Sequence, residues 1–74
     1  MNLLQVLEEM KKEENKFMWF RPVEWSEFAL TLKESITYQV PTPNGGVRYM
    51  VDTIRELTGQ WEIVSPETVI DERS

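Results

Sequence analysis

Turn signals divide most of this chain into apolar runs of about five residues, and this spacing limits what the chain can fold into. Pro22, the polar stretch 33–35, the proline-rich loop 41–46 and Gly59 each end such a run. Apolar and polar residues alternate within several runs, as is typical of half-buried strands. The pattern predicts an antiparallel sheet of four or five strands, formed by the runs 17–21, 28–32, 36–40, 47–51 and 60–64.

Helical patterns flank this predicted sheet. An amphipathic helix is predicted over 3–14, where Asn2 and Gln5 have the spacing of a capping box at its start. Its apolar stripe consists of Leu3, Leu4, Leu7 and Met10, with Val6 beside them. This stripe favours a helix packed on the core, and a partner-binding helix is the alternative.

A second, shorter helix is predicted over 54–57, directly before the last strand. Asp52 or Thr53 can cap its start, and Gly59 stands where a left-handed C-terminal cap is expected. The stretch 65–67 can begin a last helical turn, and 70–74 is expected to fray. We therefore expect one α+β domain over 1–74: an N-terminal helix packed on a twisted antiparallel sheet of four to five strands, with a short helix before the last strand.

The chain is short and lacks the side chains of several reaction classes. A domain of 74 residues buries only about 60% of its unfolded surface, so oligomerisation is an obvious source of added stability. The absence of Cys and His excludes disulfides, thiolate nucleophiles and imidazole bases. Glutamate pairs such as Glu8 with Glu9 lie on a predicted solvated helix face, where we expect them to do no acid–base work. We expect no enzymatic activity, no cofactor and no metal site.

The charge balance is acidic, with 13 Asp and Glu against 8 Lys and Arg and a net charge of −5. Acidic proteins repel phosphate backbones, and the lysines near the N-terminus are interleaved with glutamates, so we expect no binding to DNA or RNA. No apolar run approaches the length of about 18 residues needed to span a bilayer, and no signal peptide pattern is present. These features predict a cytoplasmic protein that does not associate with membranes.

Aromatic and arginine residues occur close together and point to a binding function. Arg21 lies between Trp19 and Trp25, and Arg48 precedes Tyr49 just after the turn 44–46. Aromatic rings stack on nucleobases, arginine grips phosphate with paired hydrogen bonds, and turn N–H groups can face an anion. For Arg21 and Trp25 a structural role is equally plausible. Trp61 is expected in the core, with ligand contact as the alternative.

Three segments of the chain resemble the phage Thoeris anti-defence type 2 family. They are the opening helix 3–11, the stretch Phe20-Arg21-Pro22 followed by Trp25, and the closing segment 52–64, which ends in Trp61-Glu62-Ile63-Val64. In the family the corresponding features are an N-terminal "aLe.mK" helix, a basic residue and tryptophan, and a "D(I/L)L..DWE(V/I)V" segment. The resemblance covers both ends of the chain. It extends to Arg21, Trp25, Asp52 and Trp61.

The resemblance implies a function. Members of this family are small homo-oligomers, built from a helix and an antiparallel sheet, that sequester cyclic ADP-ribose-type signals of bacterial defence without cleaving them. Some also bind cyclic dinucleotides. We therefore expect a phage or prophage protein in the host cytoplasm that sequesters a cyclic nucleotide second messenger, with its site between protomers. The expected ligand-binding residues are Arg21, Trp25, Arg48, Tyr49, Trp19 and Asp52, of which the arginines hold phosphates and Trp25 or Tyr49 stacks on a base.

Two alternatives remain open from the sequence. One is an acidic phage protein that binds and inhibits a host protein through exposed aromatic residues. The other is a structural component of a virion, which would form open-ended assemblies rather than a closed oligomer.

Overall fold

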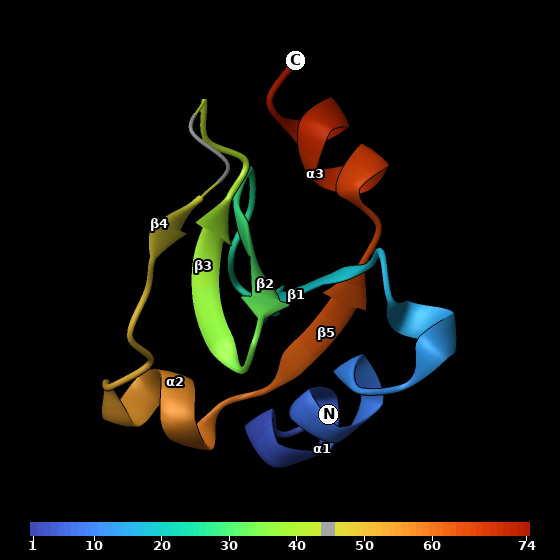
Figure 1. Cartoon of the computed structure of the whole chain (residues 1–74). Coiled ribbons are helices and arrows are strands. Elements are labelled where there is room, and N and C mark those ends of the chain that lie inside the picture. The colour runs from blue at the N-terminus through green and yellow to red at the C-terminus, as the bar shows by residue number, and fades with distance from the viewer. Residues whose placement is uncertain (44–45) are drawn as a thin grey trace.

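The computed structural model describes residues 1–43 and 46–74, and its five antiparallel strands form one sheet in the order β4-β3-β2-β1-β5 (Figure 1). The strands are β1 (Trp19–Pro22), β2 (Ala29–Lys33), β3 (Ile36–Val40), β4 (Val47–Arg48) and β5 (Trp61–Val64). The helices are α1 (Leu3–Met10), the 3-10 helix η1 (Glu13–Asn15), α2 (Ile54–Thr58) and α3 (Pro66–Glu72). The predicted α+β class is confirmed.

The sheet brings the two ends of the chain together. Strands β1 to β4 follow one another in sequence and in space, but β5 returns to pair with the outer side of β1. Phe20 lies opposite Ile63 in this pairing, and Arg21 lies opposite Glu62. The N–H of Trp61 donates to the carbonyl of Met1, so the N-terminus is tied to the same strand.

One face of the sheet, here called the α1 face, is covered by α1. Its buried core consists of Phe20, Leu30 and Trp61 from the sheet and Val6 from the helix. Asn2 and Gln5 form the predicted capping box. The predicted apolar stripe is shifted, however, because Val6 rather than Leu4 points at the sheet and Leu4 is 69% exposed.

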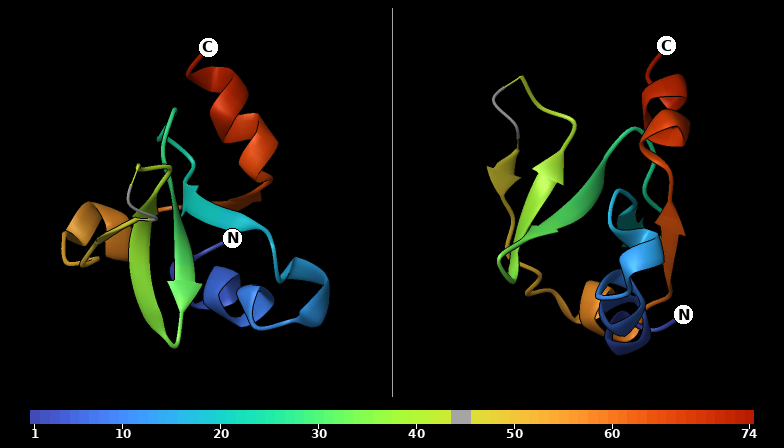
Figure 2. Two further views of the ribbon diagram at one scale, coloured as in Figure 1. Left: turned by 45° about the horizontal axis from the view of Figure 1, so that its top comes forward. Right: turned by 45° about the vertical axis from the view of Figure 1, so that its right-hand side comes forward.

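The opposite face, here called the α3 face, is covered by α3. Ala29, Val40 and Val64 are buried there against Val69 of the helix. In the right-hand view of Figure 2, α3 lies at one end of the molecule with the C-terminus, and α1 and α2 lie at the other. The expectation that residues 70–74 fray is wrong for 70–72, because α3 continues to Glu72. Ser65 caps this helix by accepting a hydrogen bond from the N–H of Thr68.

Several boundaries differ from those predicted. The first helix ends at Met10. The side-chain amide of Asn15 donates to the backbone carbonyl of Glu9 at 2.8 Å, which satisfies one of the acceptors at the end of this helix. The fourth strand is only two residues long. Tyr49 still donates its N–H to the carbonyl of Thr37, after which the chain leaves the sheet.

The turn at 34–35 and the helix end at Gly59 have distinct backbone conformations. Glu34 and Ser35 join β2 to β3 with φ of 52° and 68°, the backbone of a tight hairpin turn, and the predicted hairpin is confirmed. Gly59 has an extended backbone with φ of −82°, so the predicted left-handed cap is wrong. A Cβ at Gly59 would lie 2.6 Å from the carbonyl oxygen of Arg55, so close approach requires the glycine.

No helix within 1–43 and 46–74 combines the length and apolar character needed to cross a membrane.

Candidate functional site

Arg21, the first of the predicted phosphate ligands, is engaged inside the protein. It lies on the α3 face and is only 5% exposed. Its Nε donates to Glu62 Oε2 at 2.8 Å, and its Nη1 and Nη2 donate to Glu72 Oε1 and Oε2 at 2.6 and 2.9 Å. This two-pronged pairing with Glu72 is the strong geometry of arginine and carboxylate. Arg21 therefore joins β1, β5 and α3, and its donors are directed at carboxylates rather than at solvent.

The charge cluster shifts the acid–base behaviour of Glu72. Hydrogen bonds from the Arg21 guanidinium, and then from the backbone N–H of Glu27, lower the pKa of Glu72 from 4.5 to about 2. Its carboxylate thus stays ionised at any pH near neutrality, as a permanent partner of Arg21.

A second group of predicted residues comes together around a cavity of about 440 Å³ that is open to solvent. We call it the aromatic hollow; it is lined by Trp25, Ser26, Phe28, Gln39 and Tyr49. Trp25 meets Tyr49 edge to face, with ring centroids 5.3 Å apart and planes at 87°. This is a favoured arrangement of two aromatic rings.

Different elements supply the walls of the aromatic hollow. Trp25 and Phe28 lie in the loop 23–28 between β1 and β2, where the N–H of Trp25 donates to the carbonyl of Pro22. Gln39 lies on β3 opposite Leu30, and therefore on the α1 face. Tyr49 follows β4 and packs, like Trp25, against the core of that face.

The Tyr49 hydroxyl is hydrogen-bonded to the buried carboxylate of Glu56. It donates to Glu56 Oε2 at 2.5 Å, and the Thr53 hydroxyl donates to Glu56 Oε1 at 2.9 Å. The indole N–H of Trp61 donates to the backbone carbonyl of Glu56, which ties α2 to β5. Burial and the Glu56 carboxylate raise the pKa of Tyr49 to about 12, so the phenol keeps its proton.

Arg48 is an exposed arginine that does not line the aromatic hollow, and its register opposite Tyr38 places it on the α3 face of the sheet. It lies on β4 directly before Tyr49 and has no ion-pair partner within the part of the chain that the structure describes. Both residues line a smaller neighbouring cavity of about 240 Å³ whose apolar wall includes Leu3 and Leu7. Tyr49 therefore borders two adjoining cavities, and Arg48 borders one of them.

The structure does not bring all six predicted ligand residues together. Trp25 and Tyr49 line the aromatic hollow and Arg48 shares only the smaller cavity with Tyr49, whereas Trp19 packs on the α3 face and Arg21 is buried there. Asp52 is exposed just before α2. Trp61 is 1% exposed and belongs to the core. The predicted anion-binding turn lies partly outside the described residues, because only Gly46 of the stretch 44–46 is described.

Sequence reasoning missed Gln39, Phe28, Ser26 and Glu56. Alternation along 36–40 does separate Gln39 from Tyr38 and Val40, but it cannot say which neighbours share its face. Glu56 could have been found, because Thr53 and Glu56 have the spacing of a capping box. Its second role, as the acceptor for Tyr49, depends on the tertiary fold.

Comparisons of the chain with family models, with curated proteins and with solved structures find no match.

Proposed function

We propose that this protein binds and sequesters a cyclic nucleotide second messenger, of the cyclic ADP-ribose or cyclic dinucleotide type, without cleaving it. The observation that carries this proposal is the aromatic hollow, in which Trp25, Phe28 and Tyr49 surround a cavity of about 440 Å³. The resemblance to the phage Thoeris anti-defence type 2 family supports the same ligand class. It also implies that the protein acts in the cytoplasm of the infected host.

The lining of the hollow suits a nucleobase. Aromatic rings stack on bases with about 1 to 3 kcal/mol each, and ligand cavities commonly measure roughly 300 to 1,000 Å³. The amide of Gln39 offers both a donor and an acceptor to a base edge, and Ser26 adds a hydroxyl. A cavity with aromatic walls and a few polar groups has the composition expected of a site for one flat ligand with polar edges.

Arg48 is the residue that supports phosphate binding. It is exposed, it borders the smaller cavity that Tyr49 also lines, and within the described residues its charge is unpaired. A single guanidinium is a weak counterweight to a net charge of −5 and a ligand with more than one negative charge. We therefore propose a homo-oligomer in which a second copy brings another cation to the site, with identical sites related by symmetry.

The chemistry of the lining favours binding over cleavage. Among the described residues that line the hollow, the groups that can exchange a proton are the hydroxyls of Ser26 and Tyr49. The pKa of about 12 keeps the Tyr49 phenol protonated, and its proton is directed at Glu56. Neither group is placed to act as a general base.

Titration calorimetry with a panel of cyclic ADP-ribose isomers and cyclic dinucleotides tests the proposal. We expect binding at micromolar protein to at least one of them, and recovery of the intact ligand after denaturation. Absence of binding across the panel would contradict the proposal, and recovery of hydrolysed ligand would make the protein an enzyme. Light scattering on the same samples should show a closed oligomer.

Matched variants locate the site. Trp25→Leu should weaken binding about tenfold or more, the loss of one stacked base, whereas Trp19→Leu on the α3 face should not. Arg48→Gln should weaken binding about tenfold, and Arg55→Gln, an exposed arginine on α2, should leave it unchanged. The reverse order within either pair would place the ligand elsewhere.

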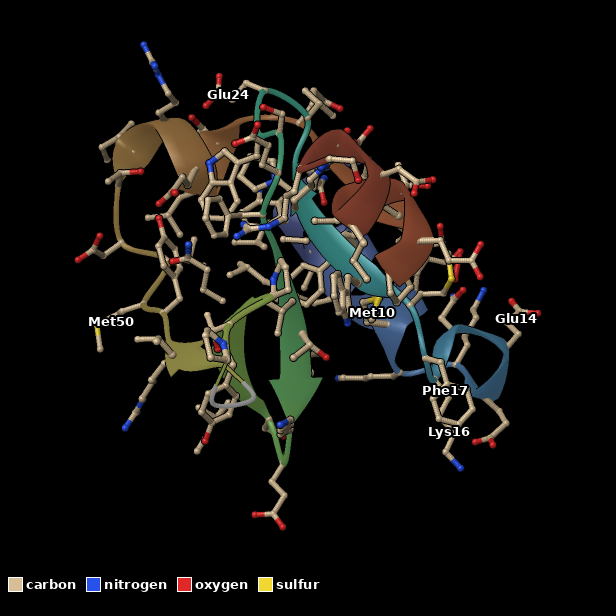
Figure 3. The ribbon with its side chains drawn as sticks, turned by 90° about the horizontal axis from the view of Figure 1, so that it is seen from above. Met10, Glu14, Lys16, Phe17, Glu24 and Met50 are labelled. Carbon is tan, nitrogen blue, oxygen red and sulfur yellow. The ribbon has the colours of Figure 1, made fainter. Side chains whose placement is uncertain are left out.

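Exposed apolar side chains favour a second candidate, an acidic protein that binds and inhibits a host protein. Phe17 is 79% exposed and Ile54 and Met50 are also exposed. Figure 3 shows Phe17 beside Lys16 on the opposite side of the molecule from Met50, so these side chains do not form one patch. Stoichiometric capture of one host protein, together with no response to the nucleotide panel, would favour this second candidate.

A further inference from the structure

The loop 23–28, which carries three of the five hollow-lining residues, is held from outside by the end of α3. The backbone N–H of Glu27 donates to Glu72 Oε1 at 3.0 Å, and Arg73 Nη1 donates to the carbonyl of Glu27 at 3.1 Å. Two consecutive residues of the C-terminal segment therefore satisfy both backbone groups of one loop residue. In Figure 3 the teal loop runs beside the red ribbon of α3.

Glu27 is the loop residue that most needs such support. Its φ of 69° is left-handed, a conformation that is unfavourable for a residue with a side chain. This backbone turn separates Trp25 and Ser26 from Phe28, so it sets the relative placement of the two aromatic side chains that line the hollow. A loop free to leave this conformation would open the hollow.

Arg73 also contacts a wall of the hollow directly. Its guanidinium lies over the Phe28 ring, 4.7 Å from the centroid, which is within the range of a cation–π interaction. Phe28 therefore has Arg73 on one side, while it lines the cavity with Trp25 and Tyr49.

The helix that supplies these contacts is itself fixed to the sheet. Val69 is fully buried against Ala29, Val40 and Val64, and Glu72 is paired with Arg21 of β1. The contacts thus connect the rigid sheet to α3, and α3 to the loop. The position of the loop is set by the C-terminal segment as well as by its own two strand ends.

We infer that Glu72 and Arg73 are positioning residues that hold the loop 23–28 so that the aromatic hollow is formed before a ligand arrives. This inference rests on the proposed function for its ligand, although the loop contacts stand without it. A preformed site binds more tightly because no ordering of the loop is needed at the moment of binding. Neither residue lines the hollow, so both act through the loop.

Arg73→Ala tests this inference with the least damage to the fold, because Arg73 is exposed and the hydrogen bonds of buried Arg21 go to Glu62 and Glu72 instead. By NMR hydrogen exchange, the hydrogen-bonded loop amides of Trp25 and Glu27 should exchange about fivefold faster than in the wild type, because the loop loses one surface hydrogen bond and one exposed cation–π contact. Amides of β2 and β3 should not change. Asp71→Ala, a neighbouring exposed position, is the matched control, and Arg73→Lys should restore part of the protection.

Nucleotide affinity gives the second readout. The dissociation constant of the best ligand in the panel should rise about fivefold in Arg73→Ala and remain unchanged in Asp71→Ala. Glu72→Gln should show a larger loss of loop protection, since Glu72 holds both Glu27 and Arg21.

The two proposals fail in different ways. If the wild type binds no nucleotide, the proposed function fails, and the exchange rates alone then decide the positioning role. Wild-type exchange rates at Trp25 and Glu27 in both Arg73→Ala and Glu72→Gln would overturn the inference. Faster exchange without any change in affinity would overturn the claim that the hollow must be preformed.

Discussion

The two faces of the sheet are closed by different chemistry. On the α3 face, α3 is fastened by a charge cluster in which buried Arg21 binds Glu62 and Glu72. On the α1 face, the helix packs through apolar side chains, and the polar contact of Tyr49 with Glu56 lies beneath an open aromatic hollow. On the α3 face Arg21 has a structural role, whereas on the α1 face aromatic rings remain accessible to solvent.

Arg21 and Arg48 show that two arginines in register positions on the same face of the sheet can have different roles. Each lies on a strand beside aromatic residues, and the sequence alone predicts phosphate binding for both. Arg21, however, lies opposite Glu62 in the register of β1 with β5, while Arg48 lies opposite Tyr38 on the short edge strand β4. A cross-strand carboxylate converts one arginine into a structural residue, and its absence leaves the other available to a ligand.

The largest effect is expected from removing the charge cluster. Arg21→Ala should lower the free energy of unfolding by about 3 kcal/mol, because it leaves two carboxylates without their partner and a gap at a buried position. Arg48→Ala should change it by no more than about 0.5 kcal/mol. Urea denaturation measures both values. Equal effects would contradict the division between a structural and an available arginine.

The next largest effect concerns the polar contact of the α1 face. Tyr49→Phe keeps the ring but leaves Glu56 Oε2 without its donor, and should cost about 2 kcal/mol, because Glu56 is buried. Tyr38→Phe is the matched control, since no hydrogen bond of the Tyr38 hydroxyl occurs within the described residues. It should change stability by less than about 0.5 kcal/mol. Equal losses would show that the Glu56 contact contributes nothing.

The helix caps allow the two faces to be weakened separately. Ser65→Ala removes the cap of α3 and Asn2→Ala removes the cap of α1, and each should cost about 1 kcal/mol. Hydrogen exchange should show the loss of protection in α3 for the first variant and in α1 for the second. Loss of protection across both helices in either variant would mean that the two faces unfold as one unit.

The smallest effect is expected from acid. The pKa of Glu72 is about 2 in the fold and 4.5 ordinarily, so its pairing stabilises the protein above about pH 4.5 and is lost as the pH falls towards 2. The side chain is 30% exposed, which screens the interaction. The difference in urea midpoint between wild type and Glu72→Gln should therefore be constant above pH 5 and should shrink towards pH 2. A difference that is equal at pH 7 and pH 2 would contradict this pairing.

Local signals explain how much of this fold the sequence could predict. Prolines, polar turns and alternation located all five strands, and Asn2, Thr53 and Ser65 marked the helix starts. These features depend on residues within a few positions of each other. The sheet order could not be read in the same way, because β5 pairs with β1 across about 40 residues.

The candidate site was less predictable than the fold for the same reason. Trp25 and Tyr49 were expected to bind ligand, and they do face each other, but only the tertiary fold joins them. The fate of Arg21 depends on Glu72, which lies in a segment that was expected to fray. A long-range ion pair leaves no local pattern in the sequence.

The three tryptophans allow the central claim to be tested in one measurement. Trp25 lines the aromatic hollow, Trp19 lies on the α3 face and Trp61 is buried in the core. The measurement is the NMR shift of the three indole N–H signals as the best-binding cyclic nucleotide is added to the wild-type protein. We predict that the Trp25 signal moves in proportion to occupancy while that of Trp19 stays in place. Movement of Trp19 with Trp25 unchanged, or no movement at saturating ligand, would contradict a nucleotide site in the aromatic hollow.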